Sequence, residues 1–397
     1  MMELQKVILH QNKTFSIKRQ HPWIFSGAIL KKDHKISDGD MVDVFDEQGQ
    51  FLGFGHFHLG SIAVKMLSFG SKHFTDKFWK VRLLEAFQSR QKLISAGLIP
   101  SNAYRLVHGE SDGLPGLIID VYKDVAVIQC HTIGMHRHID QIVEAIKSVD
   151  QLVINSVFDK SCDSLPTEYA RLVGNKFILG NEGLPQITEN ELLYEINIVQ
   201  GQKTGFFLDQ RDNRLLVKVL SQSRTILNAF CYTGGFSLSA LRGGATRVVS
   251  IDSSAKAMEL LEHNLQLNNL QDGRHQSQTE DVISYFKQIK EHEFDLIILD
   301  PPAFAKTLAK RHTAIQAYKR LNLGAILKIK CPGYLFTFSC SQVVTEELFY
   351  SAVVAAGIES GKRIKIIKRL SQAPDHPVSL FHPEGSYLKG LLLEITD

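Results

Sequence analysis

Apolar and polar positions divide the chain into an early series of short runs and a later series of longer ones. Between residues 41 and 67, three apolar runs alternate with turn residues, such as Asp38-Gly39-Asp40 and Asp46-Glu47-Gln48-Gly49. This spacing is typical of a small β-barrel. Farther along, residues 74–97 and 138–149 carry apolar side chains at helical spacing, with strand-like apolar runs between and after them. The later part of the chain is therefore predicted to be α/β.

Residues 225–252 predict a strand, a tight turn, a helix and a second strand. Gly234 lies in the turn, and the second strand ends on Asp252. Glycine lets a ligand come close to the backbone, and an acid at that strand end can accept hydrogen bonds from two ribose hydroxyls. Bulky Phe230 and Tyr232 stand where a dinucleotide fold has glycines, so a pyrophosphate does not fit easily. The stretch predicts an adenosine-type cofactor; the alternative is an ordinary βαβ crossover.

Two later strands also end in residues that can carry chemistry. The strand predicted over residues 294–299 ends in Asp300-Pro301-Pro302, and the one over residues 334–338 ends in Ser339-Cys340-Ser341. Ligands bind beyond the carboxyl ends of parallel strands, so both segments are expected at the site. A helix is predicted soon after Cys340, and a helix N-terminus stabilises a thiolate. We therefore predict that Cys340 is a nucleophile; the alternative is a small buried residue.

Composition limits the class of protein without naming a function. The chain has 397 residues, of which 44% are hydrophobic and 22% charged, as in a globular protein of two or three domains. A formal net charge of +3 is too small to indicate a nucleic-acid partner by itself. The five cysteines are scattered without CxxC spacing, so we expect no disulfide framework, no zinc site and a cytoplasmic location. No membrane segment or metal site is predicted, and His136 and His138 are expected at the surface.

The first 35 residues are rich in lysine, arginine and histidine. The run from His21 to Ile29, His-Pro-Trp-Ile-Phe-Ser-Gly-Ala-Ile, together with Gly39-Asp40, resembles the PUA domain, a small RNA-binding barrel. The basic residues would then contact phosphates, which position an RNA without reading its sequence. In the alternative, Trp23 and Phe25 fill the barrel core and the lysines form a solvated rim.

Further motifs extend the resemblance over the whole chain. They are F-x-x-D-Q-R-x-N-R at residues 206–214, T-F-S-C-S at 337–341, D-H-P-V at 375–378 and P-E-G-x-Y-L-K-G at 383–390. Together they resemble the three-domain ribosomal RNA (cytosine-5)-methyltransferase family. The resemblance implies an α/β fold with a class I S-adenosyl-L-methionine (SAM) methyltransferase domain, Rossmann-like and seven-stranded, over residues 187–397. A PUA-like RNA-binding β-barrel over residues 1–70 and a central α/β (α+β) domain over residues 71–186 would precede it.

The resemblance also implies a cofactor, a partner and a set of site residues. SAM is the implied cofactor, and RNA, in particular 23S ribosomal RNA, is the implied partner. Cys340 would be the nucleophile, and Asp300 would hydrogen-bond the N3/N4 edge of the target base. The expected cofactor contacts are Asn228, Phe230, Tyr232, Thr233, Gly234, Asp252, Asp281, Gln210 and Arg211, where Asp281 is preferred over Glu280 as the partner of the adenine amino group. The expected substrate contacts are Pro301, Pro302, Phe304, Lys306, Lys310 and Arg311, with Lys18 and Arg19 in the barrel.

The chemistry explains why a cysteine is needed. C5 of cytosine is a poor nucleophile, and thiolate addition at C6 makes it nucleophilic. The wider group of RNA cytosine-5 enzymes carries a second cysteine near the position of Ala303, so here another base or water must remove the C5 proton. The alternatives are a methyltransferase for a nitrogen of guanine or adenine, and a non-catalytic RNA-binding ribosome-assembly factor. The nucleotide modified, the choice between naked RNA and an assembling subunit, and the oligomeric state, with a homodimer as one alternative, stay open.

Overall fold

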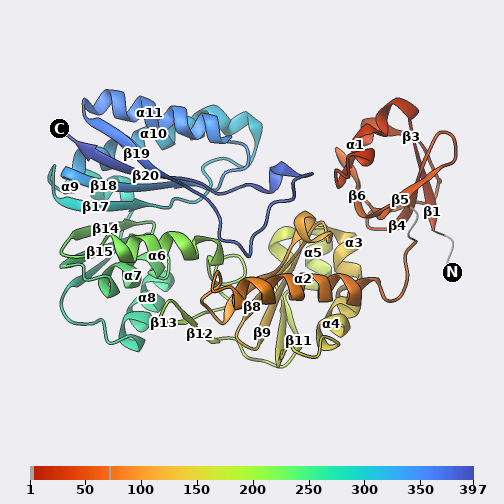
Figure 1. Cartoon of the computed structure of the whole chain (residues 1–397), viewed down its shortest axis with the longest axis horizontal. Helices are drawn as coiled ribbons and strands as arrows, with labels where there is room; N and C mark the ends of the chain where they lie inside the picture. The colour runs from red at the N-terminus through yellow and green to blue at the C-terminus, as the bar shows by residue number, and fades with distance from the viewer. Residues whose placement is uncertain (1–3, 71–72) are drawn as a thin grey trace. The chain divides into compact units, whose positions relative to one another are not determined.

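The computed structural model describes residues 4–70 and 73–397, which form two compact units (Figure 1). Unit 1 comprises residues up to Ile187 with 196–206 and 374–385, and unit 2 comprises residues 188–195, 207–373 and 386–397. The chain therefore passes between the units several times. The three-domain division expected from the sequence, with boundaries after residues 70 and 186, stays a prediction.

A six-stranded sheet at the start of unit 1 encloses its own apolar core. Its strands lie in the order β2-β6-β5-β4-β1-β3. Val42 and Val44 alternate with less buried residues along β4 and pack with Val7, Leu9 and Val64, as a strand buried on one face requires. The elements are β1 (Gln5–Leu9), η1 (Gln11–Lys13), α1 (Phe15–Lys18), β2 (Trp23–Phe25), η2 (Ser26–Ala28), β3 (Ile29–Lys32), β4 (Met41–Asp46), β5 (Phe51–Phe57) and β6 (Ile62–Phe69).

The two aromatic residues of the PUA-like run do not fill the barrel core. Phe25 is 51% exposed. Trp23 is partly buried: its Nε1–H donates to Glu110 Oε1 at 2.9 Å, and its ring lies edge-on to His382 with centroids 4.5 Å apart. Ile24, between them, points inward and is buried, because successive side chains of a strand face opposite sides. The core-filling alternative is therefore wrong for Phe25, and Trp23 anchors other segments of unit 1.

A second sheet of unit 1 has five strands in the order β11-β10-β9-β8-β7. Every residue of β9 is buried, as expected of a strand covered on both faces. Helix α2 packs Trp79, Leu83 and Phe87 into the same core. The elements are α2 (Phe78–Ser95), β7 (Ala103–His108), η3 (Gly109–Asp112), β8 (Leu117–Tyr122), β9 (Val125–Cys130), α3 (Ile133–Arg137), α4 (Ile139–Lys147), β10 (Ser156–Asp159), η4 (Cys162–Ser164), α5 (Thr167–Val173) and β11 (Lys176–Leu179).

His136 is buried, so its expected surface position is wrong. Its ring nitrogens lie 2.9 Å from Asp159 Oδ2 and 3.1 Å from the Tyr169 hydroxyl. The other Asp159 oxygen accepts from the N–H and the hydroxyl of Ser161, at 3.1 and 2.5 Å. Thr132 caps α3 and orients the helix that carries His136. A polar side chain is buried without a large loss of stability only when its hydrogen-bond partners are present, as those of His136 are.

The two short segments of unit 1 that interrupt unit 2 are held by buried hydrogen bonds. In the first, Thr204 Oγ1 lies 2.9 Å from the Tyr122 hydroxyl. In the second, Asp375 is fully buried and its Oδ2 accepts from the Arg105 N–H at 3.0 Å. The D-H-P-V motif therefore belongs to unit 1, although it lies late in the sequence.

The main sheet of unit 2 has seven strands, as expected, and their order is β16-β15-β14-β17-β18-β20-β19. The first five strands of this order are parallel to one another, whereas β20 is antiparallel to both β18 and β19. The last strand of the chain thus lies inside the sheet. The strands are β14 (Thr225–Ala229), β15 (Arg247–Asp252), β16 (His275–Thr279), β17 (Phe294–Leu299), β18 (Ile329–Ser339), β19 (Arg363–Leu370) and β20 (Lys389–Thr396), preceded by the pair β12 (Gln186–Glu189) and β13 (Leu192–Glu195).

Helices cover both faces of this sheet (Figure 1). Leu227 and Val249 belong to the core that also contains residues of α9, α10 and α11. Asn228 and Ser250, which alternate with them, face Ser237 of α7 on the other side, at 2.8 and 2.6 Å. The helices are η5 (Leu208–Gln210), α6 (Arg211–Val219), α7 (Gly235–Arg242), α8 (Ala255–Leu267), α9 (Val282–Gln288), η6 (Leu308–Lys310), α10 (Arg311–Lys328), α11 (Glu346–Ser360) and, in unit 1, η7 (Pro383–Gly385).

Candidate active site

The turn between β14 and α7 is tightly curled. Phe230, Tyr232 and Gly234 have positive φ angles of 61°, 48° and 82°. Residues other than glycine seldom adopt this conformation, which is found where a binding loop is held under strain. A Cβ at Gly234 would lie 2.7 Å from Leu261 Cγ, so the site requires glycine. Thr233 is buried within the turn.

Asp252 fixes this turn from the end of β15. Its Oδ2 accepts from the Tyr232 N–H at 3.0 Å, and its Oδ1 accepts from the Ser254 N–H at 2.9 Å. The side chain stays partly exposed, and each carboxylate oxygen has a further lone pair. Asp252 is therefore held in place with acceptor capacity left for ribose hydroxyls.

Three of the expected cofactor contacts have enclosed side chains. Asn228 donates to Ser237, and its Oδ1 is a buried acceptor without a hydrogen-bond partner among the described residues. Arg211 is fully buried, with its Nε 3.5 Å from Glu189 Oε2. Gln210 is buried and accepts from the Asn213 amide at 2.6 Å. These side chains support the local fold, and their contact with cofactor stays a prediction.

The two acids considered for the adenine amino group both follow β16. Asp281 is exposed, and its Oδ1 caps α9 by accepting from the Ser284 N–H at 2.9 Å. Glu280 is partly exposed and accepts from the Gln288 amide at 2.5 Å. The Glu280 N–H donates to the Asp252 carbonyl at 3.1 Å, which brings this turn beside the ribose acid. The preference for Asp281 stays a prediction.

Asp300 lies just beyond β17 and has an unusual environment. Desolvation by the surrounding protein raises the pKa of its carboxyl to about 7, and the nearby Asp209 carboxylate adds to the rise. A hydrogen bond from the Gln210 side chain and the Arg214 guanidinium act in the opposite direction. At neutral pH, Asp300 is therefore divided between a form that donates a hydrogen bond and one that only accepts.

Cys340 follows β18, the strand beside β17. Its Sγ lies 4.0 Å from the Pro301 carbonyl oxygen, so the T-F-S-C-S and D-P-P segments meet as predicted. Cys340 is partly exposed, whereas Cys130 and Cys231 are buried. Burial raises the pKa of both buried thiols, which keeps them protonated and unreactive.

The remaining expected base and RNA contacts of unit 2 form a wall and a rim. Pro301 is buried and Pro302 exposed, and the Phe304 ring lies 4.7 Å from the Tyr318 ring. The Tyr318 hydroxyl accepts from Ser339 Oγ at 2.9 Å, which ties this wall to the end of β18. The expected basic rim is exposed at all three positions, Lys306, Lys310 and Arg311.

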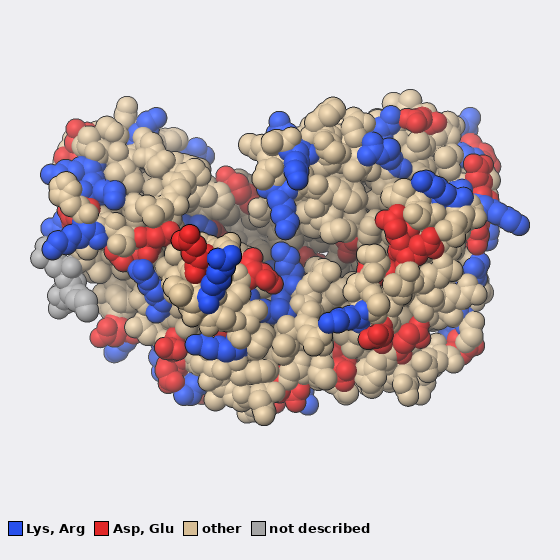
Figure 2. Space-filling model, turned by 180° about the vertical axis from the view of Figure 1, so that it is seen from behind, with Lys and Arg blue, Asp and Glu red and all other residues tan. Residues whose placement is uncertain are grey.

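In the barrel, Lys18 and Arg19 are exposed at the end of α1. The Arg19 guanidinium lies 5.3 Å from the centroid of the Phe15 ring, and Phe15 is 66% exposed. An exposed ring beside a cation can stack on an unpaired base. Figure 2 shows lysine and arginine side chains mixed with acidic ones over the barrel on the face in view, so a local cluster, and not a uniformly basic surface, is available there.

The sequence did not indicate the partners of Asp209, Tyr387 and Lys389. Asp209 is buried, with Oδ2 accepting from the Tyr387 hydroxyl at 2.6 Å and Oδ1 without a hydrogen-bond partner among the described residues. Lys389 is buried and donates to the Ser341 carbonyl at 2.8 Å. All three belong to the F-x-x-D-Q-R-x-N-R or P-E-G-x-Y-L-K-G motifs. The motifs could have flagged these residues, but letters in a motif do not say what they contact.

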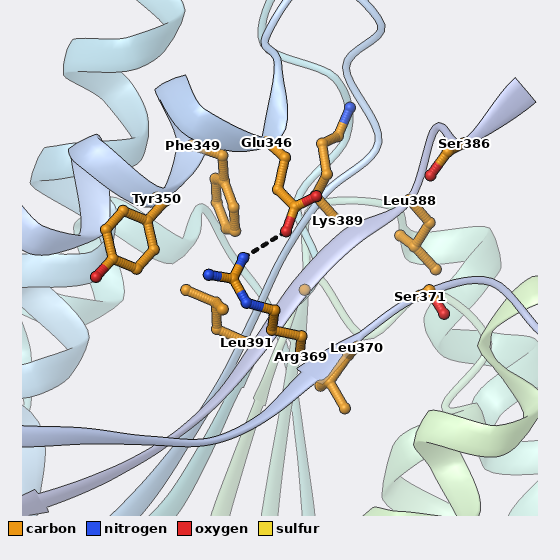
Figure 3. A pocket seen from close by; sticks show the side chains of 11 residues that line it. Glu346, Phe349, Tyr350, Arg369, Leu370, Ser371, Ser386, Leu388, Lys389 and Leu391 are labelled. Atoms are coloured by element: carbon orange, nitrogen blue, oxygen red, sulfur yellow. Dashed lines mark hydrogen bonds and ion pairs between the residues drawn. The ribbon is translucent and has the colours of Figure 1, made fainter. Parts of the chain in front are cut away.

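A pocket of about 200 Å³ lies against β20 (Figure 3). Glu346 and Arg369 point toward each other in it and form an ion pair at 2.5 Å, while the Lys389 ammonium points away from that pair. Among the described residues, no group of three or more His, Cys, Asp or Glu side chains is placed to hold a metal ion. In the same part of the chain, every helix is too short or too polar to cross a membrane.

The fold and the site define the class of protein. Residues 176–391 match the family model described as S-adenosylmethionine-dependent methyltransferase, and residues 7–69 match that of a PUA-like domain. The strained turn, the fixed Asp252 and the buried Asn228 acceptor are groups that an adenosine-type cofactor requires, so the residues present fit SAM. The protein is a SAM-dependent methyltransferase with an N-terminal PUA-like domain.

Relatives narrow the family. The chain is 39% identical over 399 residues, covering 99% of both chains, to the ribosomal RNA large subunit methyltransferase I of Alteromonas mediterranea. The chain belongs to the ribosomal RNA large subunit methyltransferase I family. A solved structure named as a candidate methyltransferase complexed with SAH matches with a TM-score of 0.83 at 22% identity, over 98% of this chain and 99% of that one. The tRNA m1G37 methyltransferase of M. jannaschii matches with a TM-score of 0.51 at 16% identity, over 71% and 76%. These two likenesses show the fold alone.

Proposed function

We propose that this protein methylates C5 of a cytosine in large-subunit (23S) ribosomal RNA through a covalent bond between Cys340 and C6 of the base. The substrate class is supported by the names of relatives that match almost the full chain. The carbon acceptor is supported by the chemistry of the site. The fold does not decide between carbon and nitrogen, because a guanine-N1 methyltransferase shares it.

The observation that carries the proposal is the meeting of a partly exposed thiol with a carboxyl group of raised pKa. Cys340 and Asp300 end two adjacent parallel strands, and Cys340 Sγ lies 4.0 Å from the carbonyl of the residue after Asp300. A nitrogen acceptor already has a lone pair and needs no thiol. A carbon acceptor needs a nucleophile at C6 and a proton donor for the ring, and these two side chains supply them.

The residues act in a definite order. SAM, when bound, supplies an electrophilic methyl group. The Cys340 thiolate forms the S–C6 bond, and the C5–C6 π electrons are displaced through C5 and C4 toward N3, where Asp300 in its protonated form donates a hydrogen bond. The same electron pair would then form the bond from C5 to the methyl carbon, and the electrons of the methyl–sulfur bond would stay with the departing sulfur. Once C5 carries the methyl group, a base removes its proton, the C5–H electron pair re-forms the C5–C6 double bond, and the C6–S bond breaks with its electrons returning to sulfur.

The barrel would hold the RNA by its backbone. Lys18 and Arg19 are exposed and can contact phosphates, and the exposed ring of Phe15 can stack on a base. If so, replacing Lys18 and Arg19 by alanine weakens RNA binding and reduces the slope of log Kd against log salt by about two, about one per lost phosphate contact. SAM affinity, measured by calorimetry, stays unchanged. The exposed Lys123, in another part of unit 1, is the matched control.

The decisive test is Cys340→Ala with RNA that carries the target cytosine. The variant is expected to lose methyl transfer by several orders of magnitude and to keep SAM affinity. RNA with 5-fluorocytidine at the target is expected to trap the wild type as a covalent complex on a denaturing gel, because fluorine cannot leave as a proton does. Near wild-type methylation by the folded variant would refute the C5 assignment and favour a nitrogen acceptor.

A further inference from the structure

Lys389 is held at the strand end that carries the nucleophile. On β20 it pairs with Ser339 of β18 in the antiparallel register, and its Nζ donates to the Ser341 carbonyl at 2.8 Å. Cys340 lies between Ser339 and Ser341 in the chain. Only 8% of Lys389 is exposed, although lysines are seldom buried without a partner for their charge.

The charge of this lysine is coupled to the thiol. Burial lowers the pKa of the Lys389 ammonium, and the charges of Cys340 and Glu346 act in the opposite direction. The interaction energy between two charges is shared. A Cys340 thiolate that raises the pKa of Lys389 therefore has its own pKa lowered to the same extent by the ammonium. Water is largely excluded from this lysine, which makes the interaction stronger than at an exposed site.

The other charged groups around Cys340 leave this interaction available. Glu346 at the start of α11 pairs with Arg369 of β19 at 2.5 Å, and in Figure 3 the Lys389 ammonium points away from that pair. Tyr318 of α10 is coupled to Cys340 and to Asp300, and burial raises its pKa to about 12, so it is neutral at physiological pH. Asp300, beyond β17, is partly protonated at neutral pH, which limits its repulsion of a thiolate.

We propose that Lys389 is a positioning residue for the nucleophile, whose ammonium stabilises the thiolate of Cys340 and whose hydrogen bond to Ser341 fixes the end of β18. The inference rests on the proposed function, in that it treats Cys340 as the nucleophile. The thiol proton leaves to water, and the sulfur electron pair forms the bond to C6. When that bond breaks, its electrons return to sulfur and the thiolate again faces the ammonium.

The test measures the reactivity of Cys340 without RNA or SAM. Cys162→Ser and Cys331→Ser remove the other two partly exposed thiols from the full chain. The alkylation rate of Cys340 by iodoacetamide is then followed from pH 5 to 10 by mass spectrometry of its peptide. Lys389→Gln removes the charge and keeps a hydrogen-bond donor, Lys389→Arg keeps both, and Lys365→Gln, an exposed lysine of β19, is the matched control.

We expect Lys389→Gln to move the alkylation profile to higher pH, so that the rate at pH 7 is about tenfold lower if the thiol pKa rises by about one. Lys389→Arg and Lys365→Gln are expected to stay within about twofold of the parent. A folded Lys389→Gln variant with the parent profile would overturn the inference. If that variant does not fold, the parent protein is used alone. An alkylation rate of Cys340 at pH 7 no greater than that of free cysteine would then overturn the inference.

Failure of this inference and failure of the proposed function give different results. If Cys340→Ala still methylates RNA, the C5 mechanism fails whatever Lys389 does to the thiol. If Cys340→Ala is inactive and Lys389→Gln has the same alkylation profile as the parent, the C5 mechanism stands and only the role of Lys389 is refuted.

Discussion

Two carboxylates, Asp159 in unit 1 and Asp300 in unit 2, stand in opposite surroundings. Asp159 is completely buried, and its two oxygens are paired with His136 and Ser161. Asp300 is partly exposed and has a second acid, Asp209, beside it. The network around Asp159 stabilises the fold because its members satisfy one another's hydrogen bonds. At Asp300, burial and the Asp209 charge disfavour the ionised carboxylate, and catalysis can use the proton that this carboxyl group keeps. Variants of each network test this contrast.

Asp300→Ala is expected to have the largest effect, on activity. Loss of a proton donor at the ring lowers the rate of methyl transfer roughly 10²–10⁴-fold, measured in single turnover with labelled SAM and saturating RNA. The free energy of unfolding is not expected to fall. A rate within a few fold of wild type would remove Asp300 from the reaction.

Asp300→Asn tests how the raised pKa of this carboxyl group affects the free energy of unfolding. The pKa of Asp300 is raised to about 7 from 3.8, so the folded state holds a proton that the unfolded state gives up. Wild-type stability therefore falls as pH rises from about 4 to 7, and at pH 8 the variant should be more stable by about 1–2 kcal/mol, after allowance for solvent screening. The expected result is a urea midpoint of the variant that exceeds that of wild type by an amount that grows from about pH 4 to pH 7 and is full at pH 8.

Asp159→Ala is expected to act on stability instead. It leaves His136 and Ser161 buried without their acceptor, which costs about 2–4 kcal/mol. The urea midpoint of unit 1 falls, and fluorescence and circular dichroism can follow it. Below that midpoint, SAM affinity is expected to equal that of wild type; a selective loss of SAM binding in the folded variant would contradict the structural role.

Asp209→Asn is expected to shift the pH dependence of activity. The variant removes the like charge beside Asp300 and keeps an acceptor for Tyr387, so the pKa of Asp300 falls. The protonated form of Asp300 is then lost at lower pH, and the descending limb of kcat/KM moves to lower pH, with a loss of several fold at pH 7.5. Asp212→Asn, an exposed acid of the same segment, is the control and should leave the limb in place.

The smallest effects are expected from the outer hydroxyls of the two networks. Tyr169→Phe removes the partner of His136 in unit 1 and should lower stability by about 1 kcal/mol without a change in the pH profile. Tyr387→Phe removes the hydrogen bond of 2.6 Å that the tyrosine donates to Asp209. It should move the descending limb of kcat/KM against pH while changing the free energy of unfolding little. If both variants behaved alike in both measurements, the contrast between the two networks would be lost.

Sequence patterns predicted the strand ends well and the contacts across them less well. The strands that end at or just before Asp252, Asp300 and Cys340 were expected, because short apolar runs and the turns after them are local features. The partners of these residues were not. Asp209 and Lys389 were recognisable from the sequence only as members of motifs that resemble the family.

Burial was also misjudged where it depends on distant segments. His136 looks like a surface residue in its own helix, and it is buried because β10 and α5 bring Asp159 and Tyr169 to it. Phe25 looks like a core residue, and strand alternation around Ile24 turns it outward. The partners that bury His136 are distant in sequence, so its neighbours could not reveal them, whereas the exposure of Phe25 follows from which face of β2 packs into the barrel.

By itself, the sequence determined the α/β class of the later part of the chain, the glycine turn, the acid at the end of β15 and the likeness to a methyltransferase family, since spacing and turn chemistry act over a few residues. Tertiary structure alone decided that β20 enters between β18 and β19, that Lys389 therefore reaches Ser341, and that Asp209 raises the pKa of Asp300. Charges and hydrogen bonds act through space, and their strength depends on how much water the folded chain excludes from around them.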